Sequence, residues 1–121
     1  MEKSGGPRRR KAAAARKRKP EDPHAQDNAF VAALNHSIRR ALLKLYLEHD
    51  DPLSPKELAE LTGEKLSTIS YHVRVLADKN AIELAEEEPV RGSVAHFYRV
   101  SPLTKRTPWV LQSLDVESPS S

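Results

Sequence analysis

The stretch over residues 54–80 constrains the fold most, because it carries a helix start, a helix stop and then a second helix. Ser54 is a favourable N-cap, Pro55 suits the first helical position, and Glu57 completes a capping box with Ser54. Gly63 can adopt the left-handed conformation that closes such a helix. The pattern therefore predicts a short helix that starts after Ser54 and ends near Gly63.

A second helix is predicted over residues 67–80, with Ser67 as its cap, after a connection over Gly63–Leu66. At about 100° per residue, four side chains of this helix share one face, and the apolar ones among them anchor the helix. That face carries Ile69, Val73, Leu76 and Asn80. The opposite face, near the start of the helix, carries Ser67, Ser70, Tyr71 and Arg74. The pattern indicates a helix that packs on one side and presents polar groups on the other.

These two helices fit the requirements of a helix-turn-helix. Such a unit needs a small residue where the helices cross, a turn residue that tolerates unusual angles, and a branched apolar anchor. Ala59, Gly63 and Ile69 meet those needs in that order. The second helix is then a recognition helix, whose first amides favour phosphate. Arg74 can reach a guanine edge or a phosphate, and the Ser and Tyr hydroxyls, with Thr68 at the same end, can serve either.

A further helical stripe precedes this unit. Its apolar residues recur at spacings of three and four, namely Phe30, Val31, Leu34, Ile38, Ala41, Leu42 and Leu45. Asp27 or Asn28 is the expected cap. A break over residues 35–37 is expected to leave a short leading helix and a main helix over Ser37–Glu48, which ends before Pro52.

A β-hairpin is predicted after the recognition helix. Residues 82–84 and 94–100 alternate in the manner of strands, and the loop between them is expected over Glu87–Ser93. Leu53 is a candidate for a short third strand. A helix-turn-helix followed by a hairpin predicts an α+β fold. We expect a winged helix-turn-helix with a three-helix core and a β-hairpin wing.

The C-terminal residues are predicted to form a tail over residues 103–121. Pro102 starts it, and Thr107 with Pro108 can open a last short helix. That helix would carry Trp109, Val110, Leu111 and Leu114. Trp109 is interpreted as a core residue or part of a dimer interface.

Positive charge is concentrated in residues 1–20, which have a net charge of +8, whereas the remaining residues sum to −5. Residues 1–27 contain no apolar residue larger than Ala after Met1, and they are predicted to be a disordered basic arm. Such an arm attracts nucleic acid first and an anionic membrane surface second. The alternatives are a solubilising tail and, in a eukaryotic source, a nuclear-import signal. The winged domain is expected over residues 28–102.

Composition excludes several other classes of protein. The chain has no Cys, which excludes a disulfide framework and thiolate metal sites. It lacks a run of about 18 apolar residues, and no apolar stretch follows the charged N-terminus, so neither a membrane span nor a secretory signal is expected. No His pair has helical zinc spacing, and His49 with its two following aspartates is interpreted as a solvated helix end. We expect no enzyme activity, no metal, no cofactor and a cytoplasmic, nucleoid-associated protein.

Residues 54–102 resemble the winged helix-turn-helix domain of the ArsR type of transcriptional regulators. The resemblance lies in Ser70-Tyr71-His72-Val73 with Leu76, in Ala81-Ile82 after Asn80, and in the wing residues Arg91-Gly92 and Phe97-Tyr98-Arg99. It implies that Arg91 lies beside the minor groove. Many members are cysteine-based metal sensors, which this chain cannot be. Two roles stay open for His72. It can pack or form a backbone hydrogen bond, or it can make a glancing phosphate contact.

The predicted DNA-binding residues are Ser67, Thr68, Ser70, Tyr71, His72, Arg74 and Arg91. The expected partners are double-stranded DNA and a second copy of the chain, which would pair through the first helix and the tail around Trp109. Residues 28–112 hold eleven cations and eleven acids, so the arm is expected to supply most of the electrostatic attraction. The alternative function is a protein-interaction module that binds nucleic acid unselectively through its arm.

Overall fold

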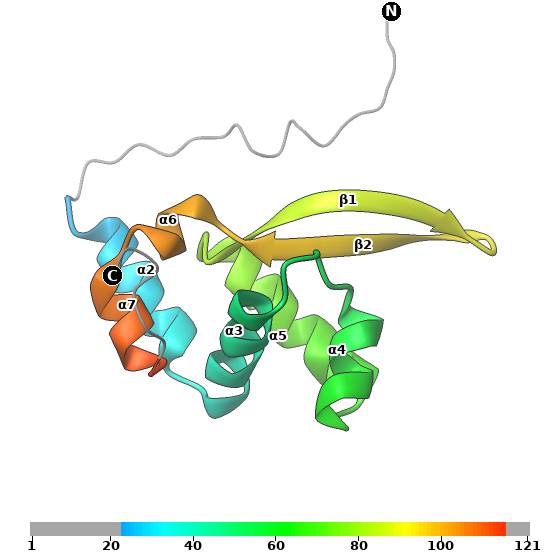
Figure 1. The fold of residues 1–121 in the computed structure, drawn as a ribbon, viewed down its shortest axis with the longest axis horizontal. Coiled ribbons are helices and arrows are strands. Elements are labelled where there is room, and N and C mark those ends of the chain that lie inside the picture. Colours follow the sequence, from blue (N-terminus) through cyan, green and yellow to red (C-terminus); the bar gives the residue numbers. More distant parts are fainter. Residues whose placement is uncertain (1–22, 116–121) are drawn as a thin grey trace, which may run out of the picture.

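The computed structural model describes residues 23–115, which form six helices and one hairpin (Figure 1). The elements are α2 (Ala25–Leu34), α3 (Ser37–Glu48), α4 (Pro55–Thr62), α5 (Leu66–Asp78), β1 (Ile82–Val90), β2 (Ser93–Val100), α6 (Pro102–Lys105) and α7 (Pro108–Ser113). The hairpin extends past α4 and α5 at one end of the molecule, while α2 and α7 lie at the other end (Figure 1). The predicted winged helix-turn-helix fold is confirmed. Most of the predicted arm, residues 1–22, lies outside the described residues.

The predicted break between the first two helices is confirmed, because α2 ends at Leu34 and α3 begins at Ser37. Two cations of α3 stabilise the end of α2. Arg39 Nε donates to the carbonyl oxygen of Ala33 at 2.9 Å, and the Arg40 guanidinium donates to that of Leu34 at 2.7 Å. Cations at a helix C-terminus satisfy its last carbonyl groups and its dipole.

The start of the first helix differs from the prediction. Helix α2 begins at Ala25, so the last residues assigned to the arm are helical, and neither Asp27 nor Asn28 is its cap. A tertiary contact accounts for the difference. The Gln26 side chain donates to the carbonyl oxygen of Lys79 and accepts from the Asn80 side chain, both at 2.9 Å.

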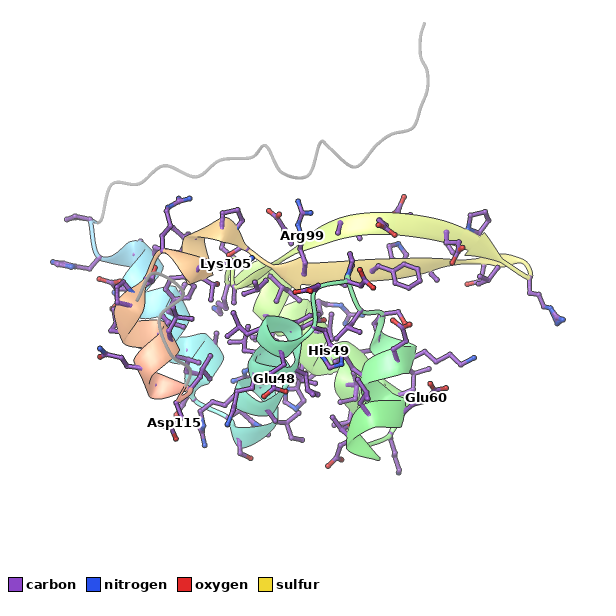
Figure 2. The ribbon with its side chains drawn as sticks, in the orientation of Figure 1. Glu48, His49, Glu60, Arg99, Lys105 and Asp115 are labelled. Atoms are coloured by element: carbon purple, nitrogen blue, oxygen red, sulfur yellow. The ribbon has the colours of Figure 1, made fainter. Side chains whose placement is uncertain are left out.

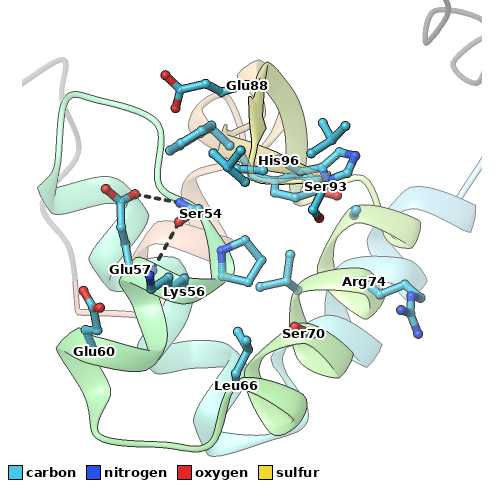
Figure 3. A pocket seen from close by; sticks show the side chains of 18 of the residues that line it. Ser54, Lys56, Glu57, Glu60, Leu66, Ser70, Arg74, Glu88, Ser93 and His96 are labelled. Carbon is cyan, nitrogen blue, oxygen red and sulfur yellow. Dashed lines mark hydrogen bonds between the residues drawn. The ribbon is translucent and has the colours of Figure 1, made fainter.

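The capping box predicted for α4 is present. Glu57 N donates to the Ser54 hydroxyl at 3.2 Å, and Ser54 N donates to the Glu57 carboxylate at 2.9 Å (Figure 3). Gly63 closes the helix in the left-handed region, with a φ of 78°. Helix α5 begins at Leu66, one residue earlier than predicted. Ser67 therefore lies in the first turn instead of at the cap, and no side chain of the described residues caps α5.

The wing is longer than predicted. Residues assigned to its loop belong to β1 and β2, which pair in antiparallel register from Ile82 opposite Val100 to Val90 opposite Ser93. The turn consists of Arg91 and Gly92, whose positive φ values of 29° and 75° suit a two-residue hairpin loop. The register shifts between Leu84 and Glu86.

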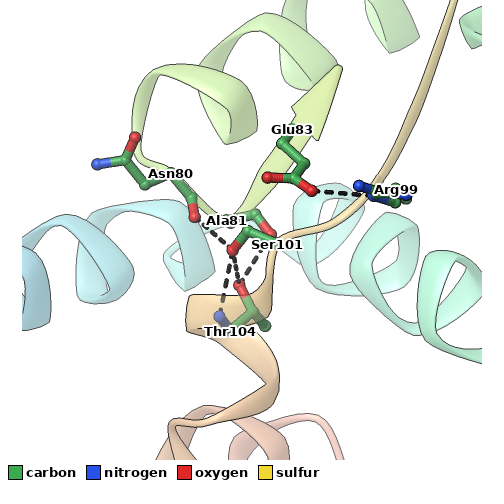
Figure 4. Close-up of polar contacts among 6 residues, drawn as sticks. All are labelled: Asn80, Ala81, Glu83, Arg99, Ser101 and Thr104. Atoms are coloured by element: carbon green, nitrogen blue, oxygen red, sulfur yellow. Dashed lines mark hydrogen bonds and ion pairs between the residues drawn. The ribbon is translucent and has the colours of Figure 1, made fainter. Parts of the chain in front are cut away.

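Two further features tie the hairpin to the helices. Leu53 forms the predicted third-strand bridge, since it exchanges two 2.9 Å backbone hydrogen bonds with Tyr98. After β2, Ser101 accepts from Thr104 N at 3.2 Å and donates to the carbonyl oxygen of Asn80 at 2.7 Å (Figure 4). These bonds start α6, a helical turn that the sequence analysis did not predict.

The predicted last helix is confirmed as α7, and it closes the core against α2. The Trp109 ring packs edge-on against Phe30, with a centroid distance of 6.2 Å. Its indole N–H donates to the Asp27 carboxylate at 3.3 Å. Trp109 is therefore a half-buried member of the chain's own core. No helix among residues 23–115 is long and apolar enough to cross a membrane.

Candidate nucleic-acid interface

Helix α5 is fixed in place by its apolar face. Ile69 and Leu76 are fully buried, and Val73 is nearly so, within a core shared with α2, α3, α4, the hairpin and α7. Ala59 of α4 packs against the same core at the crossing of the two helices. The predicted apolar anchors are therefore buried, and the orientation of α5 is set by apolar packing on one side. Asn80, predicted on the same face, is instead exposed, because α5 ends at Asp78, two residues earlier than predicted.

The outward face of α5 carries five of the predicted site residues. Ser67, Tyr71 and Arg74 are exposed, with 56% of Tyr71 accessible, while Thr68 and Ser70 are half-buried beside them. Arg74 extends away from the helix, and Ser70 lies on the side of the groove described below (Figure 3). Four of these side chains occupy the first two turns, near the amide-rich N-terminal end of the helix, and Arg74 lies in the third turn.

His72 does not share that face. It is 5% exposed and points toward the elbow between α2 and α3, where its Nδ1 lies 3.2 Å from the Arg39 guanidinium and its ring centroid 4.4 Å from that of His36. This burial agrees with the packing interpretation. A direct phosphate contact by His72 would require the elbow to open.

A groove of about 930 Å³ separates α4 and α5 from the wing (Figure 3). Its floor includes the apolar side chains of Leu66, Val73, Ala77, Val94, Phe97 and Tyr98. Lys56 at the start of α4 and Arg74 of α5 contribute cationic groups to its wall. Burial raises the pKa of Tyr98, against the opposing effect of the Arg74 guanidinium, so the Tyr98 hydroxyl stays protonated near neutral pH.

The charge of the groove and wing is mixed. Acidic groups lining the groove are Glu57, Glu60, Asp78 and Glu88. On the wing, Arg99 pairs with Glu83 at 2.9 Å, and Glu87 lies 3.2 Å from His96. Arg99 points away from α3, α4 and α5 (Figure 2). Arg91 stands at the exposed tip, where the hairpin turns, so it is the wing cation best placed to meet a polyanion.

Three cations that matter here were not predicted to have a role. Arg39 and Arg40 bind the carbonyl groups at the end of α2, and Lys56 lines the groove. The sequence holds a signal for Arg39 and Arg40, because cations placed just after a helix break commonly bind the carbonyl groups that end the preceding helix. The contact of Arg39 with His72, 33 residues away, carries no local signal.

A helix buried on one face, a preceding helix closed by a left-handed glycine, and a two-stranded wing define a winged helix-turn-helix fold. Comparison with known families agrees: residues 34–85 match the family described as a helix-turn-helix domain. The chain therefore carries a helix-turn-helix domain within a winged-helix fold. A search of curated proteins by sequence gave no match.

Solved structures show the same architecture. HlyU from Vibrio cholerae is similar with a TM-score of 0.57 and 20% identity, over 76% of this chain and 91% of that one. The homodimeric winged helix-turn-helix DNA-binding domain of Mb0332 from Mycobacterium bovis, described as a possible ArsR-family transcriptional regulator, is similar with a TM-score of 0.58 and 20% identity. That likeness covers 93% of this chain and 84% of the other.

Proposed function

We propose that the protein is a DNA-binding transcription regulator that reads duplex DNA with α5. The observation that carries this proposal is the division of α5 into two faces. Its apolar anchors are buried, while Ser67, Tyr71 and Arg74 project from its first turns. A helix held rigidly from behind, with polar side chains at its exposed N-terminal end, suits insertion into the major groove. The proposal assigns no catalytic step.

Within this proposal the outward residues have different tasks. Arg74 reads a guanine edge or binds a phosphate, because its guanidinium is a planar donor with bidentate geometry. Ser67, Thr68, Ser70 and Tyr71 offer hydroxyls to bases or phosphates. Arg91, at the tip of the wing, contacts the backbone or the minor groove. This proposal assigns His72 no direct readout, because the side chain is buried and faces the elbow between α2 and α3.

We further propose that the basic arm supplies most of the attraction to DNA. The eleven cations of residues 28–112 are balanced by eleven acids, and three of these cations have partners within the domain, since Arg39 and Arg40 bind carbonyl groups and Arg99 is paired with Glu83. Residues 1–20 carry a net charge of +8. Affinity for DNA falls with salt in proportion to the number of phosphates that the protein neutralises.

The arm is tested by charge removal in the full chain. A truncation at residue 28 would remove Gln26 and its contacts with α5, so substitution is the cleaner change. Arg8→Gln with Arg9→Gln should reduce the slope of log affinity against log salt by about two. Lys105→Gln with Arg106→Gln is the matched control, since it removes the same charge near α6. Equal slopes for both double variants would refute the role of the arm.

A homodimer is the proposed assembly, bound to half-sites about one helical turn apart. The similarity to the homodimeric Mb0332 domain supports it. On this chain, Val31 of α2 is 58% exposed although it lies in an apolar stripe, next to the region where Trp109 packs on Phe30. A Val31→Glu variant should sediment as a smaller species than the wild type at equal concentration. A wild type that is monomeric at all concentrations would refute the dimer.

The experiment that tests the proposed function is selection of duplexes from a random pool by the full chain, at a salt concentration that suppresses the contribution of the arm. We expect an enriched motif that is lost in Arg74→Ala and retained in Arg99→Ala. Binding of all duplexes with equal affinity would contradict the proposal.

The second candidate is a protein-interaction module. The acidic strand β1, which carries Glu83, Glu86, Glu87 and Glu88, and the neutral balance of the domain favour it. Such a module would give no enriched motif, and its DNA binding would disappear when the arm cations are replaced.

A further inference from the structure

The elbow between α2, α3 and α5 holds two histidines that both act as hydrogen-bond acceptors. Arg39 Nη1 lies 3.2 Å from His72 Nδ1, and a guanidinium can only donate, so His72 Nδ1 must be unprotonated. Ile38 N donates to His36 Nδ1 at 3.2 Å, which caps α3. The two ring centroids are 4.4 Å apart. Both contacts therefore require neutral imidazoles whose remaining proton is on Nε2.

Arg39 is the link between this elbow and the recognition helix. Besides His72, it donates to the carbonyl oxygens of Ala33 at 2.9 Å and Ala32 at 3.2 Å, so one guanidinium joins the end of α2 to the inner side of α5. The neighbours of His72 on the outward face, Tyr71 and Arg74, are the side chains assigned to DNA. A shift of His72 away from Arg39 would move the helix that carries them.

We propose that Arg39 and neutral His72 are positioning residues for the recognition helix, and that protonation of His72 releases this helix and weakens selective DNA binding in acid. A protonated His72 would place an N–H against the Arg39 guanidinium and add a cation beside it and beside His36. The inference rests on the proposed function for its DNA readout and stands independently of it for the elbow itself.

The electrostatic surroundings favour the neutral form. Three causes lower the pKa of His72 below its ordinary value of 6.5. In order of size, they are burial of the imidazole, the neighbouring His36 and the Arg39 guanidinium. Glu64, in the connection between α4 and α5, acts in the opposite direction and does not outweigh them. The ring of Tyr71 also lies near, 5.0 Å from that of His72. The carbonyl groups at the end of α2 accept from Arg39.

The direction of the pH dependence follows from this lowered pKa. As pH falls below about 6.5, the unfolded chain takes up a proton at this position before the folded chain does. The contribution of His72 to stability is therefore complete above about pH 6.5 and is lost progressively below it. Selective binding that requires the neutral form weakens by up to about tenfold for each pH unit below the folded pKa.

The first test is independent of DNA. Nitrogen-detected NMR of the full chain, titrated from about pH 8 to about pH 5, should show unprotonated Nδ1 on both His36 and His72 at the start. The backbone signals of α5 and of the end of α2 should then shift together with the His72 titration. Protonated Nδ1 on His72 at neutral pH, or titration of His72 without any change in α5, would overturn the inference even if the protein binds no DNA.

The second test uses variants in DNA binding. His72→Asn keeps an acceptor near the position of Nδ1 but cannot titrate, and His96→Gln on the exposed wing is the control. The probe is the random duplex pool together with any motif enriched from it. Between about pH 7.5 and about pH 5, the preference of wild type and His96→Gln for the motif should fall relative to that of His72→Asn, by up to about tenfold for each pH unit below the folded pKa of His72.

Arg39→Lys should lower the preference at neutral pH and flatten its pH profile, because an ammonium cannot reproduce the three contacts of the guanidinium. Identical pH profiles for wild type and His72→Asn would overturn the positioning role. A motif that is never enriched, alongside a coupled NMR titration, would reject the proposed function and leave the elbow intact.

Discussion

The recognition helix and the wing differ in how they are held. Helix α5 buries Ile69, His72, Val73 and Leu76, and its position is fixed along its whole length. The hairpin is anchored at its base, where Ile82 and Val100 are buried, while its distal half is exposed on both strands. Val94 is 47% exposed although it is apolar. Packing therefore holds one element, and backbone pairing alone holds the outer part of the other.

This difference explains how the two elements can divide the work of binding. Base readout needs side chains held in a fixed orientation, which a helix packed into the core provides. A hairpin that extends beyond the core can adjust to the backbone of a duplex without disturbing the domain. Its acids also limit its attraction to phosphate, so a contribution from the wing is expected at its tip, where Arg91 stands.

The largest expected effect is on the free energy of unfolding. Substitution of a buried anchor of α5 should lower this free energy far more than substitution in the wing. Leu76→Ala should lower the free energy of unfolding by about 2–5 kcal/mol, because it leaves a cavity under α5. Val94→Ala, at an exposed site, should change it by about 0.5 kcal/mol or less. Denaturant unfolding measures both. If Leu76→Ala prevents folding, Ile69→Val should still show a loss of about 0.5–1.5 kcal/mol. Equal losses at the two sites would contradict the distinction.

The next effect is on selectivity. Arg74→Ala should lower the preference for an enriched motif over random duplex by about 1–3 kcal/mol and leave the unfolding free energy nearly unchanged, because the side chain projects from the surface. Arg99→Ala removes the same charge from the outer side of the wing and is the control. Competition binding at fixed salt measures the preference. A larger loss in the control than in Arg74→Ala would assign readout to the wing.

A smaller effect is expected at the tip of the wing. Arg91→Ala should weaken binding to all duplexes to a similar extent and reduce the salt slope by about one, which is the signature of a single phosphate contact. Affinity measured against salt for the motif and for random duplex checks this. A loss confined to the motif would instead mean that the wing reads sequence.

The smallest effect concerns the ion pair on the outer side of the hairpin. Arg99→Ala should cost about 0.2–1 kcal/mol in unfolding free energy, because the side chains of Arg99 and Glu83 are 59% and 37% exposed and solvent screens their attraction. Glu83→Gln should have a similar effect, and the double variant should cost no more than either single one. A loss of several kcal/mol would show that the base of the wing contributes to the core.

The sequence alone determined the local features of this protein, which are the points where helices begin, end and break. The capping box of Ser54 and Glu57, the left-handed Gly63 and the break before Ser37 were all predicted, because the atoms involved lie within a few residues of one another. The buried face of α5 followed from helical spacing. These features were enough to predict the fold and the outward residues of α5.

The tertiary structure decided the features that join distant segments. Helix α2 starts at Ala25 because Gln26 binds residues more than fifty positions away. The wing is longer than its loop residues suggested, because pairing between strands can overcome the weak strand propensity of Glu and Pro. His72 belongs to the elbow instead of the outward face, since Arg39 and His36 lie beside it in space. Local chemistry sets where helices begin and end, whereas burial and long-range hydrogen bonds set what each side chain can reach.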